Sequence, residues 1–207
     1  MIMDTLLMWA VRKHISCAWA LLYIERWLRA PMVDVTGERI ERSRGTPQGG
    51  VVSPVLSNTF LHYAFDIWMK RVYPDLRWCR YADDELVHCR SEQEAIAVMA
   101  ALQVRLAECG LELHPTKTKI VYCKDVDRKG SYPNFKFDFL GYCFRPRLVQ
   151  NRRNKSLFCG FNPAVSVSAL KNMRSAIRDL KLRNRTQFEL SDIGKQINPL
   201  IRGWIAY

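Results

Sequence analysis

The sequence has no apolar run long enough to span a membrane. Arg, Lys or Glu interrupts its longest apolar stretches well before the roughly 20 residues that a membrane-spanning helix needs. Its first residues do not form the charged segment and apolar run of a secretory signal peptide. These absences argue against a membrane-bound or secreted protein, and they make the cytoplasm the expected location.

Paired metal-binding cysteines are also missing. The sequence has seven Cys residues, but none are spaced as Cys-x-x-Cys, and no His lies at zinc-ligand spacing from a Cys pair. A zinc ribbon or a disulfide framework is therefore not expected. Most of the thiols should be small core residues in a reducing compartment.

Positive charge is abundant, and it is concentrated in the last third of the chain. The 207 residues are 48% hydrophobic and 25% charged, as in a globular protein, and the net charge is +12. Residues 124–207 carry 17 basic and 6 acidic residues, whereas residues 79–123 carry 5 and 7. A basic bias confined to one region indicates binding to nucleic-acid phosphates. An anionic membrane surface or solubility alone are alternatives, but neither explains the acidic middle.

Two adjacent acids, Asp83 and Asp84, lie in the middle of a predicted β-hairpin. Apolar, aromatic and Cys residues flank them at 76–79 and 86–89, so we expect two short strands with the acids at the turn. Neighbouring carboxylates repel each other and resist desolvation. A bound divalent cation such as Mg²⁺ would offset that cost. The alternative is a solvated turn, the more common role of an isolated Asp-Asp pair.

Local signals predict most elements of the first 145 residues. We expect a helix over 4–14 with Asp4 as its N-cap, a helix over 18–29 that Pro31 ends, and a hairpin over 32–40. Ser53 and Pro54 begin a helix that runs to about residue 70. A capping box at 91–94 begins another helix, which Gly110 ends. Strands are expected over 119–122 and 135–144.

The segment Gly-Thr-Pro-Gln-Gly-Gly at residues 45–50 cannot form regular structure. Gly lets a ligand approach the backbone closely, Gln48 offers an amide, and the start of the following helix favours phosphate. Gln48 and Gly49 are therefore candidates for contact with a nucleotide or a template base. The alternative is a turn that only leads into the helix.

Basic residues dominate the region after residue 144. We expect a loop over 145–155, an amphipathic helix over 168–183, and two short helices at 190–198 and 199–207. In the amphipathic helix a basic stripe lies beside an apolar stripe formed by Leu170, Met173, Ile177 and Leu180. The basic stripe is either an ordinary solvated face or a surface that contacts the RNA backbone. We favour RNA contact because the preceding loop is also basic. The candidate RNA-binding residues are Arg145, Arg147, Arg152, Arg153, Lys171, Arg174, Arg178 and Lys181.

Taken in order, several motifs resemble those of bacterial group II intron-encoded reverse transcriptase/maturases. They are Gly-Thr-Pro-Gln-Gly at 45–49, Tyr-Ala-Asp-Asp at 81–84, His-Pro-Thr-Lys-Thr-Lys at 114–119, Phe-Asp-Phe-Leu-Gly at 137–141 and Asn-Pro-Leu-Ile-Arg-Gly-Trp at 198–204. The resemblance implies an α+β fold. Residues 1–145 would form a partial reverse-transcriptase palm, an antiparallel sheet with packed helices. Residues 146–207 would begin the helical thumb, or maturase-specific region.

The resemblance also implies a chemistry and a set of partners. The activity would be RNA-directed DNA synthesis by two-metal phosphoryl transfer, with Asp83 and Asp84 as ligands of Mg²⁺, of which the full-length enzyme would bind two ions. Lys117 would assist the nucleotide triphosphate, although a plain surface lysine is the alternative. The implied nucleotide- and template-binding residues are Gln48, Gly49 and Tyr81. The partners would be group II intron RNA, bound for splicing and retrohoming, a DNA primer or target and dNTPs, and the full-length form could be a homodimer.

Two parts of the family pattern have no counterpart in the sequence. A third acid, in a segment of the form Asp-x-x-x-Phe-Phe-Asp, and the fingers that cover the incoming nucleotide are both absent. We therefore expect a fragment that does not polymerise DNA efficiently by itself, with an open sheet edge where the missing strand would pair. The alternative function is a catalytically inactive RNA-binding remnant or a splicing cofactor.

Overall fold

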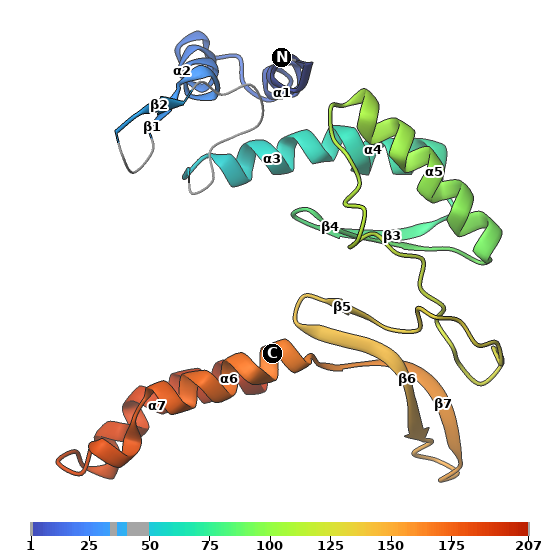
Figure 1. Ribbon diagram of the computed structural model, residues 1–207, viewed down its shortest axis with the longest axis vertical. Helices are drawn as coiled ribbons and strands as arrows, with labels where there is room; N and C mark the ends of the chain where they lie inside the picture. Colours follow the sequence, from blue (N-terminus) through green and yellow to red (C-terminus); the bar gives the residue numbers. More distant parts are fainter. Residues whose placement is uncertain (1, 34–36, 41–49, 207) are drawn as a thin grey trace. The chain divides into compact units, whose positions relative to one another are not determined.

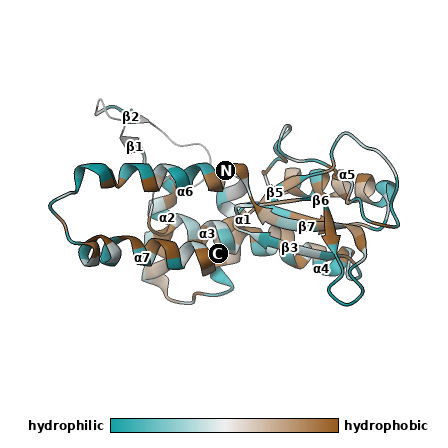
Figure 2. Ribbon diagram, turned by 90° about the horizontal axis from the view of Figure 1, so that it is seen from below, coloured by the Kyte–Doolittle hydropathy of each residue, from teal (hydrophilic) through white to brown (hydrophobic). Residues whose placement is uncertain are grey.

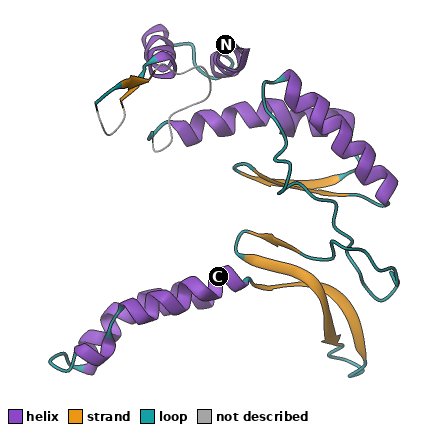
Figure 3. Ribbon diagram, in the orientation of Figure 1, coloured by secondary structure: helices purple, strands orange, loops and turns teal. Residues whose placement is uncertain are grey.

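The computed structural model describes residues 2–33, 37–40 and 50–206. It divides into two compact units, Met1–Ile120 and Val121–Tyr207. Helices and antiparallel strands occur together (Figures 1 and 3), which confirms the predicted α+β class. The predicted boundary between a palm and a maturase-specific region at residue 145 stays a prediction. Within the described residues, no helix combines the length and the apolar character needed to cross a membrane.

The first unit begins with two helices that pack against a third. Helix α1 spans Ile2–Arg12 and α2 spans Ala18–Arg29, so the prediction for the second helix is confirmed. Asp4 lies in the first turn of α1, and its prediction as the N-cap is wrong because the helix begins earlier. Strands β1 (Met32–Val33) and β2 (Arg39–Ile40) form the expected hairpin, whose residues 34–36 lie outside the described part. The buried cluster of this region comprises Leu7, Met8, Val11, Ile24, Leu28, Leu56, Phe60, Ala64 and Cys109.

The predicted helix after Pro54 is a run of three segments. Helix α3 spans Ser53–Leu61, a π-helical segment η1 spans His62–Asp66, and α4 spans Ile67–Val72. The N-cap position is Val52, so Ser53 is the first helical residue, and Pro54 lies in the first turn. The π-helical segment was not predicted. Such segments frequently occur at functional sites.

Helix α5 (Glu92–Glu108) covers one face of a hairpin made by strands β3 (Arg77–Tyr81) and β4 (Asp84–His88) (Figure 1). The predicted capping box is confirmed, since Ser91 Oγ accepts a hydrogen bond from the Glu94 amide at 3.1 Å. Gly110 follows the helix with φ of 74°, as predicted for its end. The buried cluster between helices and hairpin comprises Phe65, Met69, Leu76, Val98 and Leu102, with Trp78 and Val87 packed against it.

The predicted strand over residues 119–122 is wrong. That stretch has no strand assignment. Among the described backbone contacts, Tyr122 donates to the Asn134 carbonyl at 2.8 Å, but no ladder develops around this bond. A β-prone stretch without a paired neighbour stays irregular.

The second unit contains a three-stranded antiparallel sheet in the order β5-β6-β7, and this corrects two predictions. Strand β5 spans Phe137–Phe139, β6 spans Tyr142–Gln150 and β7 spans Leu157–Val165. The single strand predicted over 135–144 is interrupted by a two-residue turn at Leu140 and Gly141, whose φ angles are 48° and 80°. The loop predicted over 145–155 is mostly strand, because β6 pairs with β7 along nine residue pairs.

The C-terminal helices also differ from their predictions. Helix α6 spans Val167–Asp179, a 3₁₀ turn η2 spans Leu182–Asn184, and α7 spans Leu190–Ala206 as one helix with Pro199 inside it. The first therefore ends before Lys181, and the two short helices predicted after residue 189 are joined. Figure 2 shows an apolar and a polar side on both. Neither has a buried residue among those described, so the apolar stripe of α6 is at most half-buried in this chain.

Candidate active site

The acidic hairpin has a two-residue turn at Ala82 and Asp83. Strands β3 and β4 pair residue for residue, and the last pair is Tyr81 with Asp84. Asp83 therefore lies in the turn, whereas Asp84 is the first residue of β4, which corrects the prediction of both acids at the turn. Both are exposed. Ala82 has φ of 53°, a backbone conformation that favours glycine.

The two faces of the hairpin differ in character. Because side chains alternate along a strand, Tyr81 and Asp84 share the face opposite to Trp78 and Val87, which pack against the core. Tyr81 is 63% exposed. The open face therefore presents an aromatic ring and a carboxylate next to the turn that carries Asp83, which suits contact with a ligand.

Arg80, which the sequence analysis did not single out, connects the hairpin to the helices. Its Nε and Nη2 donate to the two carboxylate oxygens of Asp66 at 2.7 Å each. Its Nη1 donates to Asn58 Oδ1 and to the Ala82 carbonyl, both at 2.9 Å. Asp66 also lies 3.2 Å from His62 Nδ1.

Two carboxyl groups near Arg80 respond to it differently. Burial would raise the pKa of Asp66, but hydrogen bonds from Arg80 and His62 outweigh burial and lower it. Burial raises the pKa of Glu85 to about 7, against the attraction of Arg80, and the negative charges of Asp66 and Asp83 raise it further. Glu85 pairs with Arg80 across the strands. Its charge state is therefore sensitive to the charge at the turn.

The donor chemistry at the turn fits a magnesium ion in part. Mg²⁺ in proteins keeps several waters and binds one or two carboxylates together with substrate phosphates. Asp83 and Asp84 supply two exposed carboxylates of this kind. Among the residues that the structure describes, no group of three or more His, Cys, Asp or Glu side chains could hold a metal. The hairpin thus offers an incomplete ligand set that water and phosphate oxygens would complete.

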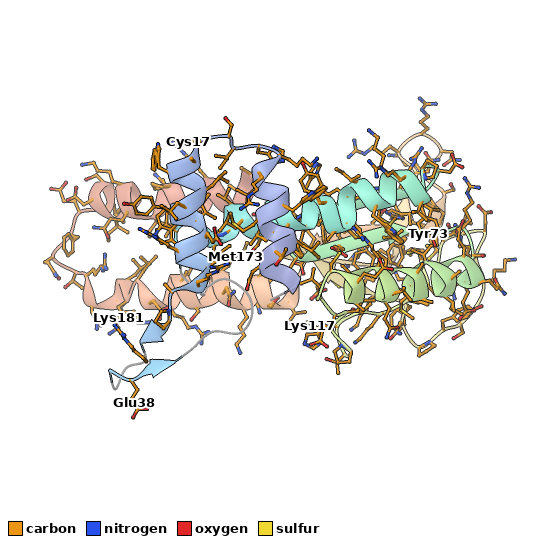
Figure 4. The ribbon with its side chains drawn as sticks, turned by 90° about the horizontal axis from the view of Figure 1, so that it is seen from above. Cys17, Glu38, Tyr73, Lys117, Met173 and Lys181 are labelled. Atoms are coloured by element: carbon orange, nitrogen blue, oxygen red, sulfur yellow. The ribbon has the colours of Figure 1, made fainter. Side chains whose placement is uncertain are left out.

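The other residues predicted to handle the nucleotide are not brought to the hairpin by any observed contact. Lys117 is exposed in a turn (Figure 4), where its amide lies 3.4 Å from His114 Nδ1. In the described part of the chain, no hydrogen bond or ion pair joins its side chain to the hairpin. Gln48 and Gly49 lie outside the described residues. The roles of all three stay predictions.

The basic residues of α6 are available for contact. Lys171, Arg174 and Arg178 are exposed along the helix, and Arg178 Nε donates to the Arg174 carbonyl at 3.4 Å. Lys181 follows the helix with φ of 46° and is also exposed. The predicted stripe is therefore present on the helix for three of its four members.

The β6–β7 hairpin places its arginines in different surroundings. Arg145 is exposed, but Arg147 is half-buried and donates to the carbonyls of Asn162 at 3.3 Å and Cys143 at 3.4 Å. Arg147 thus has partners within the sheet. Arg152 and Arg153 are exposed in the connecting loop.

That loop is ordered by its own side chains. Asn151 Oδ1 accepts from the Arg153 amide at 2.9 Å, and Asn154 Oδ1 accepts from the Ser156 amide at 3.1 Å. Lys155 has φ of 60° and its amide donates to the Asn151 carbonyl at 2.9 Å. The loop therefore holds its basic residues on a defined backbone.

Comparison with known proteins gives two family matches and one curated relative. The family described as reverse transcriptase (RNA-dependent DNA polymerase) matches residues 5–144, and the group II intron, maturase-specific domain matches residues 170–207. Protein YkfC of Escherichia coli (strain K12) is 28% identical over 180 residues, which cover 71% of this chain and 43% of the relative. The chain thus spans less than half the length of this relative.

The two matches follow each other in the order that the motifs predicted, and members of the reverse transcriptase family typically use divalent metal ions. The predicted resemblance is therefore confirmed. The chain belongs to the reverse transcriptase (RNA-dependent DNA polymerase) family, among the group II intron-encoded reverse transcriptase/maturases.

Proposed function

We propose that this chain carries the metal-binding hairpin and part of the RNA-binding surface of an RNA-directed DNA polymerase that also assists splicing of its intron RNA. The observation that carries the proposal is the hairpin itself. Asp83 lies in a tight turn, Asp84 stands beside it on an open face, and Arg80 ties the turn to two helical segments. Within a family of polymerases, exposed carboxylates on so constrained a turn suit metal-dependent phosphoryl transfer.

The proposed roles combine the chemistry of the family with the exposed positions of Asp83, Asp84 and Tyr81. Asp83 and Asp84 would contribute ligands to Mg²⁺, which when bound activates the primer 3′-hydroxyl and neutralises the leaving pyrophosphate. Tyr81, on the same face as Asp84, offers its ring to the nucleotide or template. Lys117 supplies positive charge for the triphosphate. Gln48 and Gly49, which lie outside the described residues, are proposed from the sequence to contact the nucleotide or template.

The RNA-binding part of the proposal depends on exposed positive charge. Lys171, Arg174 and Arg178 on α6 and the loop arginines Arg152 and Arg153 can reach phosphates, because none is held in an ion pair among the described contacts. Arg147 contributes less, since its guanidinium bonds to the sheet. Group II intron RNA, a DNA primer or target and dNTPs are the proposed partners, with retrohoming as the outcome.

A second candidate function is RNA binding without catalysis, as in a splicing cofactor. It is favoured because, among the described residues, no group of three or more His, Cys, Asp or Glu side chains could hold a metal ion. Primer extension on an RNA template in Mg²⁺ separates the two. Under the first function, extension occurs and Asp83→Ala abolishes it while RNA affinity is kept. RNA binding with no extension by the parent chain would favour the second.

A further inference from the structure

A single guanidinium group holds the turn of the acidic hairpin against the helices behind it. Arg80 uses four N–H donations to reach Asp66, Asn58 and the Ala82 carbonyl. Its side chain is only 10% exposed and that of Asp66 only 17%. The planar guanidinium makes bidentate contacts to Asp66 at 2.7 Å each, so it has little freedom to rotate. The position of this group is therefore set by its partners on α3 and the π-helical segment.

The bond to Ala82 acts directly on Asp83. The carbonyl of Ala82 and the amide of Asp83 belong to one planar peptide group, so fixing that carbonyl also orients the backbone from which Asp83 projects. Ala82 has φ of 53°, a conformation that is strained for a residue other than glycine. A hydrogen bond from Arg80 at 2.9 Å stabilises this backbone conformation.

Asp66 controls the charge behind the turn. Arg80 alone would place an uncompensated positive charge close to the two acids, and it would repel an approaching cation. The bidentate pair with Asp66 offsets that charge. The lowered pKa of Asp66 keeps its carboxylate ionised at neutral pH, which is what this compensation requires.

We propose that Arg80 and Asp66 are positioning residues, which fix the Ala82–Asp83 peptide and balance the local charge so that Asp83 and Asp84 can bind a divalent cation. This inference rests on the proposed function, because it assumes that the two acids bind metal. It adds that the affinity for metal depends on a helical acid 17 residues before Asp83.

The test is a Mn²⁺ titration of the chain with an RNA template and DNA primer present, in which electron paramagnetic resonance measures free Mn²⁺. Arg80→Lys keeps the positive charge but loses the bidentate guanidinium contacts. Asp66→Asn keeps the side-chain shape but leaves the positive charge of Arg80 uncompensated. We expect each to weaken Mn²⁺ binding by about tenfold or more, as for other residues that orient metal ligands. The matched control, Arg77→Lys, changes an exposed arginine of the same strand and should leave the affinity unchanged.

A rescue variant separates positioning from a general loss of stability. Glycine adopts positive φ without strain, so Ala82→Gly should restore part of the Mn²⁺ affinity that Arg80→Lys removes. Thermal melting identifies the variants that remain folded. If Arg80→Lys does not fold, Asp66→Asn still tests the charge balance.

The outcomes for the two levels of the proposal are distinct. Unchanged Mn²⁺ affinity in folded Arg80→Lys and Asp66→Asn would overturn the positioning role while the metal site stands. If Asp83→Asn combined with Asp84→Asn also leaves Mn²⁺ binding unchanged, the proposed function itself is wrong, and the inference is lost with it.

Discussion

At the scale of single residues, Arg80 interacts with two carboxyl groups on the inner side of the hairpin, which faces the helices. One belongs to Asp66 of the π-helical segment and the other to Glu85 of β4. Asp66 takes the bidentate bonds of Arg80, whereas Glu85 meets the same guanidinium only through its charge. Hydrogen bonding therefore outweighs burial at Asp66, and burial dominates at Glu85. The two acids contribute to stability with opposite dependence on pH.

Glu85 should make the folded chain less stable as pH rises. Its pKa is about 7 in the folded state, against 4.5 for an ordinary glutamate, so the folded state binds more protons than the unfolded state between these values. The free energy of unfolding then falls as pH increases through that window. Glu85→Gln should flatten this dependence and melt at a higher temperature than the parent at about pH 8.

Circular dichroism melts in buffers with a metal chelator measure this effect. Glu112→Gln is the matched control, because Glu112 is exposed and its replacement should leave the pH profile unchanged. Parallel profiles for Glu85→Gln and the parent would contradict the prediction.

The sequence indicated the acids of the hairpin but not the residue that holds them. Alternation along β3 places Arg80 on the inner side with Trp78, and a charge directed inward requires a partner. That signal could have identified Arg80 as a residue with a role. It could not identify Asp66, because the acid lies on a helical segment whose π-turn, also not predicted, determines which side chains face the hairpin.

At the scale of elements, helices with clear local end signals were predicted well, and the pairing of β6 with β7 was not. Helix α2 has its predicted bounds, and α5 has its capping box and terminal glycine. Strand β7 was missed because its partner strand carries Arg145, Pro146 and Arg147 in succession. Among the described residues, no strand pairs with β6 on its β5 side beyond Phe144, so a proline without an N–H is tolerated there.

The cap of α5 gives a prediction at this scale. Ser91 Oγ satisfies the Glu94 amide at the start of a 17-residue helix that covers the inner face of the hairpin. Ser91→Ala should lower the free energy of unfolding by about 1 kcal/mol. Chemical denaturation measures this difference. Ser57→Ala, at an exposed position inside α3, is the control, and an equal loss there would show that the cap is not the cause.

At the scale of the whole molecule, the chain separates its charges along the sequence. The acidic hairpin belongs to the unit Met1–Ile120, and most of the excess positive charge lies within Val121–Tyr207. The composition predicted this separation, whereas the division into structural units depends on packing that composition does not encode. The proposed polymerase function would use both properties, since cations would collect at the acids while basic residues bind phosphates.

Salt dependence of RNA binding tests the role of the positive charge. Each phosphate contact to single-stranded RNA contributes about 0.7 to the slope of log affinity against log salt concentration. Replacing Arg174 and Arg178 together with Gln should therefore weaken binding and reduce the slope by about 1.4. Filter binding over a series of salt concentrations measures it. The same double replacement at Lys70 and Arg71, exposed residues of α4, keeps the change in net charge but should leave the slope close to that of the parent. If both pairs change the slope equally, the RNA responds to net charge alone, and the basic side of α6 is not a contact surface.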